Sequence, residues 1–126
     1  MLSPFFFLPM IHLTPNVEGN SVAVNPYQAR KFLPTFTTYL MALIEEATGN
    51  TTVFIPDVTE DNERYTRISL PTNAEDLVNG SIRLTRSGLY TYKIFGQNSA
   101  TNLDPEDASV VGICEVGACK VSDEVP

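Results

Sequence analysis

The chain has 126 residues, 43% of them hydrophobic and 18% charged, with a formal net charge of −7 and a sequence pI near 4.5. This length and composition predict one globular domain rather than a disordered chain. The acidic balance argues against nucleic-acid binding, which needs clustered Lys and Arg to neutralise phosphates.

The first ten residues, MLSPFFFLPM, form an apolar arm ahead of a predicted domain at residues 11–126. An exposed run of Phe5, Phe6, Phe7 and Leu8 would be an aggregation liability, so it needs a cover. It is too short to span a bilayer, and it lacks the basic residue and cleavage site of a signal peptide. Three interpretations stay open: an edge strand or core plug, an anchor inserted into a neighbouring protein, and a cleaved signal. We predict that these four residues form a partner-binding segment.

Two short strands are predicted at residues 11–14 and 21–24, around a turn that contains Pro, Asn and Gly. The only histidine, His12, lies in the first strand and is interpreted as a structural residue. Residues 26–34 form a connecting stretch bounded by two prolines.

Residues 36–47 fit two patterns. One helical face would carry the apolar residues Phe36, Tyr39, Leu40, Leu43, Ile44 and Ala47. The unbroken apolar run at 39–44 instead fits a buried strand, and the pattern alone slightly favours the helix. A strand at 51–55 follows and is stopped by Pro56.

The acidic segment at 57–63 is predicted to be a polar loop. Its oxygen-bearing side chains could hold a calcium ion, although the spacing and mid-loop Gly of an EF-hand are absent. A solvated loop is the preferred interpretation, and we predict neither a metal nor another cofactor. A strand at 64–70 comes next, and residues 74–78 form a single helical turn or an Ω-like loop.

The clearest strand signal lies between Gly80 and Gln97. Apolar and polar residues alternate on both sides of a break at Ser87-Gly88, and a period of two is typical of strands with one face in the core. The predicted core scaffold is Tyr39, Tyr65, Ile82, Leu84, Tyr90, Tyr92 and Ile94.

The end of the chain predicts an exposed loop at 97–107 and strands at 110–114 and 118–121. Cys114 and Cys119 could form a disulfide across a tight turn, whereas a continuous strand would place them on opposite faces. We favour two reduced structural thiols. Seven to nine short strands predict an all-β fold, as a two-sheet sandwich or small barrel, and we adopt a single antiparallel β-sandwich.

Residues that could support catalysis are poorly placed. Glu45 and Glu46 are adjacent and diverge in either a strand or a helix, and no Gly-rich phosphate loop, GxSxG or HExxH motif occurs. We therefore expect no catalytic residues and no enzyme activity. The alternative function is carbohydrate or receptor binding on an aromatic platform, for which Tyr27, Tyr65 and Tyr90 are candidates.

Several motifs follow one another in order: MIHLTPN at 10–16, the apolar segment from Tyr39, Arg64-Tyr65, Asn79-Gly80, GLYTYKIFGQ at 88–97, NLD at 102–104 and VGICEVGACKV at 111–121. This order resembles that of small β-sandwich virion structural proteins of tailed bacteriophages. The resemblance covers most of the chain from Met10 onward. It departs at Phe95, where a second Tyr is usual, and in the added residues 1–9. It favours a strand at 39–46.

The resemblance implies a structural role in the virion, as a capsid decoration or a head–tail or tail accessory protein assembled in the host cytoplasm. The implied partners are other virion proteins in a homo-oligomer or symmetric array, bound through sheet edges and the apolar arm. Neither nucleic acid nor a membrane is expected as a partner. The acidic balance suits this role because it limits sticking to the packaged genome.

Overall fold

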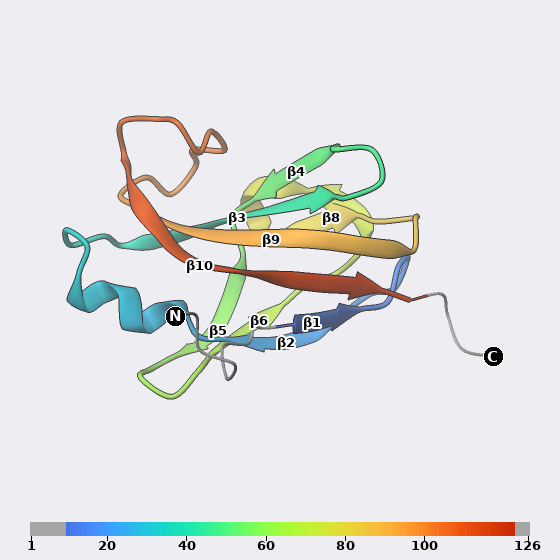
Figure 1. Cartoon of the computed structure of the whole chain (residues 1–126), viewed down its shortest axis with the longest axis horizontal. Helices are drawn as coiled ribbons and strands as arrows, with labels where there is room; N and C mark the ends of the chain where they lie inside the picture. The colour runs from blue at the N-terminus through green and yellow to red at the C-terminus, as the bar shows by residue number, and fades with distance from the viewer. Residues whose placement is uncertain (1–9, 123–126) are drawn as a thin grey trace, which may run out of the picture.

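The computed structural model describes residues 10–122, which form ten strands and two short 3₁₀ helices (Figure 1). In chain order they are β1 (Met10–Leu13), β2 (Ser21–Val24), η1 (Pro26–Lys31), β3 (Thr38–Glu45), β4 (Thr51–Phe54), β5 (Asp57–Asp61), β6 (Thr66–Ser69), β7 (Asn73–Asp76), η2 (Leu77–Asn79), β8 (Ser81–Arg83), β9 (Gly88–Gln97) and β10 (Val110–Val121).

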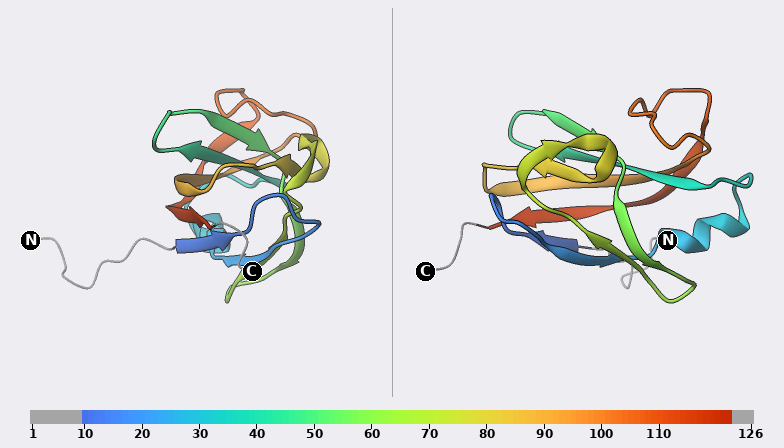
Figure 2. Two further views of the ribbon diagram at one scale, coloured as in Figure 1. Left: turned by 90° about the vertical axis from the view of Figure 1, so that its right-hand side faces the viewer. Right: turned by 180° about the vertical axis from the view of Figure 1, so that it is seen from behind.

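The strands form two stacked sheets and a separate pair. The larger sheet has the order β1-β10-β9-β3-β4, the smaller has the order β2-β6-β5, and β7 pairs with β8. Figure 2 shows β5 and β6 crossing the long strands of the larger sheet at a steep angle. The two sheets contribute to one shared core, and the predicted all-β fold is confirmed.

The main core lies between the sheets and takes residues from both. Met41 of β3, Tyr92 of β9 and Ile68 of β6 are at most 1% exposed. Removing such side chains from water is the main favourable contribution to folding. The predicted scaffold residues in this core are Tyr39, Ile82, Leu84, Tyr90, Tyr92 and Ile94. Tyr65 is the exception, since it is only partly buried and its hydroxyl donates to Glu60 Oε2 at 2.9 Å.

The helix favoured by the pattern at residues 36–47 is wrong. This segment contains β3, which pairs antiparallel with both β4 and β9 in the interior of the larger sheet. Five consecutive residues of β3 are buried, because an interior strand covered on both faces needs apolar side chains on both. An unbroken apolar run includes every third and fourth position, so it also matches a helical face.

Two further segments contain strand residues, one predicted as a polar loop and the other as a helical turn or an Ω-like loop; the helical turn is found only at η2. The acidic segment at 57–63 contains β5, an edge strand that pairs antiparallel with β6. Edge strands tolerate charge because one side of the strand remains in water. Residues 74–78 span the end of β7 and the start of η2. These additions explain why the described residues form more strands than the seven to nine predicted.

The last strand also differs from the prediction. Residues 110–121 form one strand, β10, which pairs antiparallel with β9 and parallel with β1, so the sandwich is not purely antiparallel. The register of β10 shifts between Ile113 and Glu115. This shift leaves Cys114 as an extra residue, and it brings Glu115 opposite the core residue Ile94.

Candidate protein-interaction site

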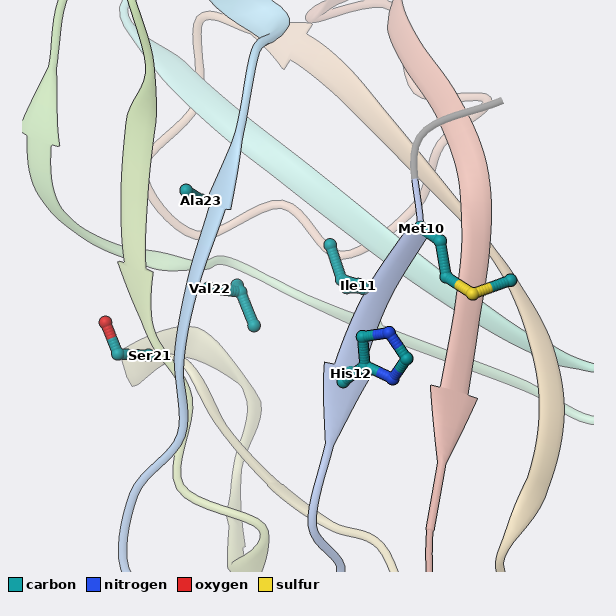
Figure 3. Close-up of a pocket in the computed structure, with 6 residues that line it drawn as sticks. All are labelled: Met10, Ile11, His12, Ser21, Val22 and Ala23. Carbon is teal, nitrogen blue, oxygen red and sulfur yellow. The ribbon is translucent and has the colours of Figure 1, made fainter. Parts of the chain in front are cut away.

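The edge strands β1 and β2 lie beside each other at one side of the sandwich. Among the described residues, each is paired with only one neighbouring strand. A groove of about 240 Å³ lies between them, and Figure 3 shows its lining residues Met10, Ile11, His12, Ser21, Val22 and Ala23. Ile11 and Val22 point toward one another and are 4% and 5% exposed, whereas Met10 and His12 point away from β2. The floor of the groove is therefore part of the apolar core.

This edge lacks the usual protection against pairing with another strand. Unpaired edges accept extended segments of other chains, and soluble proteins often block them with charged side chains or proline. None of the six residues that line the groove is Lys, Arg, Asp, Glu or Pro. Each strand also offers an unpaired backbone along four residues. Each of the two strands therefore keeps one backbone edge without a strand partner among the described residues.

The outer face of the larger sheet, which turns away from the main core, carries a second apolar surface. We call it the outer strip; it consists of the exposed side chains Met10 (52%), Leu89 (52%), Ile113 (50%) and Val116 (37%). The register places them on one face of β1, β10 and β9: Met10 lies opposite Ala118, Val116 lies opposite Lys93, and Leu89 lies opposite Lys120. Because successive side chains of a strand point to opposite faces, Ile11, Tyr90 and Ile94 on the same strands point into the core.

The other half of the same face is covered by the chain itself. Leu40, Ala42, Ile55 and Phe95 form a second cluster of buried residues, against which Leu103 packs. Leu103 belongs to the loop between β9 and β10, predicted as exposed at 97–107 and seen at the upper left of Figure 1. The chain thus buries the half toward β3 and β4 and leaves the half toward β1 exposed.

A polar cluster ties η1 to the sandwich. Asp61 accepts hydrogen bonds from the hydroxyls of Tyr39 at 3.1 Å and Thr66 at 2.6 Å, and it pairs with Arg30 at 3.4 Å. The Arg30 guanidinium lies 4.2 Å from the ring centre of Phe36. These contacts connect η1, β3, β5 and β6, so we assign the cluster a structural role.

A second carboxylate, Glu115, holds the segment before η1. It accepts a hydrogen bond from the Tyr92 hydroxyl and another from the Asn25 amide at 2.7 Å. The sequence indicated neither role, because residues 57–63 were expected to form a solvated loop and Glu115 lay between two predicted strands. Only the register shift at Cys114 could have indicated that Glu115 turns inward, and that shift depends on the pairing of β10 with β9.

Both cysteines are free thiols, and the tight turn that a disulfide would need is not formed, because β10 continues through residues 115–118. Cys119 is fully buried, and Cys114 is partly buried against the same core. Burial raises the pKa of Cys119 to about 12 and the pKa of Cys114 to about 11.

We therefore expect the native thiols to react poorly with a disulfide reagent such as DTNB at mildly alkaline pH. The thiolate is the reactive form, so Cys119 should not react and Cys114 should react slowly. Unfolding in guanidinium chloride without reductant should release both thiols at once, as measured by absorbance. Finding no titratable thiol after unfolding would indicate a disulfide instead.

The remaining candidate residues are dispersed. Phe5, Phe6, Phe7 and Leu8 lie outside the described residues, and His12 is exposed on β1. Tyr90 is buried and donates to the Arg86 carbonyl at 3.0 Å. Tyr27 lies beside Arg30 on η1, and Tyr65 directly precedes β6. Because Tyr90 belongs to the core, the three tyrosines do not form one exposed platform.

Within residues 10–122, no group of three or more His, Cys, Asp or Glu side chains is arranged to hold a metal ion. Over the same range, the structure has no helix with the length and apolar character needed to cross a membrane.

No family model, no curated protein and no solved structure matches this chain. The candidate interaction site is therefore defined by the geometry of the chain itself. It consists of the groove between β1 and β2 together with the outer strip.

Proposed function

We propose that this protein is a structural virion component of a tailed bacteriophage, a capsid decoration or a head–tail or tail accessory protein, without catalytic activity. The observation that carries the proposal is the open edge, where two unprotected edge strands lie beside an exposed apolar strip. On a free monomer such a surface promotes aggregation. In an assembly, neighbouring subunits can bind to it and bury it.

The placement of the recognised motifs supports this proposal. MIHLTPN contains β1, GLYTYKIFGQ is β9, and VGICEVGACKV makes up most of β10. These three strands are neighbours in the larger sheet, and they carry the whole outer strip. Three of the segments that resemble phage virion proteins therefore carry the outer strip and the β1 side of the groove, whereas β2 lies outside them.

The proposed partners are other virion proteins, in a homo-oligomer or symmetric array. In such an array each subunit repeats the same contact, so modest individual affinities combine into a stable assembly. The net charge of −7 suits a position among proteins rather than on the packaged genome. Carbohydrate binding on the three candidate tyrosines gains no support, because Tyr90 is buried in the core.

Mass spectrometry of purified particles, and of separated heads and tails, tests the proposed function. We expect the chain at a fixed copy number in one of the two fractions. Its absence from particles, combined with binding of the isolated protein to a glycan array, would instead favour a sugar-binding module.

A further inference from the structure

We propose that the outer strip of one chain is covered by residues 5–8 of a second copy, so that the isolated protein self-associates by exchanging its N-terminal segments. This inference does not depend on the virion role, because it concerns contacts between two copies of this chain alone.

The chemistry of the outer strip suits an aromatic segment without charge. Lys93 lies opposite Val116, and Lys120 lies opposite Leu89, so two lysines flank the apolar side chains on the same face. Their aliphatic stems extend the apolar surface, and their ammonium groups favour the faces of aromatic rings. An incoming basic segment would be repelled by these lysines.

Residues 5–8 have the matching chemistry. They are Phe5, Phe6, Phe7 and Leu8, and no charged side chain occurs between residues 1 and 11. They also start from the right place, since Met10 belongs to the outer strip and residues 5–8 precede it by only two to five positions. At about 3.3 Å per extended residue, these positions lie within about 7–17 Å of the Met10 backbone. In the sequence, each copy therefore carries an apolar segment close to Met10, a residue of the outer strip.

The strand pairing of Met10 argues against a reversal of the chain at Pro9. A reversal with Pro9 at the second position of a β-turn would require Met10 in a helical or left-handed conformation. Met10 is instead a strand residue, paired with Ala118. Such a reversal would be needed to bring residues 5–8 back over the outer strip of their own chain, so we assign them to the strip of a second copy.

Sedimentation velocity over a range of concentrations tests this contact in the full chain. We expect the wild-type protein to form a closed oligomer and both Val116→Glu and the double variant Phe6→Ser/Phe7→Ser to be monomeric. Val78→Glu is the matched control, because Val78 is 38% exposed and belongs to η2, which contacts β4 at the opposite edge of the sheet. It should associate like the wild type, and circular dichroism checks that every variant is folded.

Mixing the two monomeric variants identifies the direction of the contact. The Val116→Glu chain keeps its segment, and the Phe6→Ser/Phe7→Ser chain keeps its strip, so together they can make one segment–strip contact. We expect a one-to-one complex. Wild-type protein that stays monomeric, or a mixture that does not associate, would overturn the exchange. Self-association of the Phe6→Ser/Phe7→Ser variant would overturn it as well, by indicating that two strips face each other.

Discussion

Tyr92→Ala is expected to lower the free energy of unfolding by about 3–5 kcal/mol, among the largest losses available to any single substitution in this chain. Tyr92 is 0% exposed, and on β9 it lies between Leu43 of β3 and Gly117 of β10. Its removal leaves a cavity in the main core, and it takes away the hydroxyl that donates to Glu115. Urea unfolding followed by circular dichroism measures the loss, because the chain has no Trp to report by fluorescence.

Tyr65→Ala provides the matched control for this prediction. It makes the same chemical change at a partly buried position outside the core, where the expected loss is below about 1 kcal/mol. Equal losses at the two positions would contradict the assignment of Tyr92 to the centre of the core.

The second large effect is alkaline unfolding. Burial, with a contribution from the Asp61 carboxylate, raises the pKa of Tyr39 from 10.0 to about 12. Burial and the hydrogen bond to Glu115 raise the pKa of Tyr92 as well. Burial also raises the pKa of Cys119 from 9.0 to about 12. These groups are neutral when protonated, so burial stabilises their protonated forms in the folded protein.

The sign of the pH dependence follows from these directions. Because the folded pKa values lie above the unfolded ones, the unfolded chain loses its protons first as the pH rises. The stability contribution of these groups is complete below a pH of about 9 and is lost between about 9 and about 12. We therefore expect the free energy of unfolding to fall steeply across this interval.

Phenolate absorbance and circular dichroism, recorded together against pH, check this prediction. Ionisation of Tyr39 and Tyr92 should coincide with the loss of sheet structure. Tyr92→Phe should make the alkaline loss of stability shallower, because one of the buried titrating groups is gone. Complete ionisation of all five tyrosines in a chain that remains folded would contradict it.

Period-two alternation identified the strands whose two faces differ. Tyr90, Tyr92 and Ile94 of β9 point into the main core while Leu89, Thr91 and Lys93 point outward, so the pattern in the sequence matches the geometry. The same rule failed at β3, where Leu40 and Ala42 are buried on the outer face and Met41 and Leu43 on the inner. A strand buried on both faces has no alternation to detect.

The location of the candidate interaction site could not be predicted from the sequence, because it results from contacts between segments that are far apart in the chain. The outer strip exists because Leu103 covers only the half of the sheet toward β3 and β4. The open edge exists because β1 pairs in parallel with β10, which lies about a hundred residues further along the chain. Sequence alone indicated that Phe5–Leu8 needs a cover, but it gave no location for that cover.

The central claim is that the outer strip is the contact surface in assembly. Its most direct test is to assemble particles with Val116→Glu in place of the wild-type protein and to measure the copy number of the chain in the purified particles. Soluble expression must be matched, and particles assembled with Val78→Glu serve as the control. We predict that Val116→Glu is absent or strongly depleted, whereas Val78→Glu keeps the normal copy number. Val116→Glu at the wild-type copy number would contradict a role for this surface in assembly.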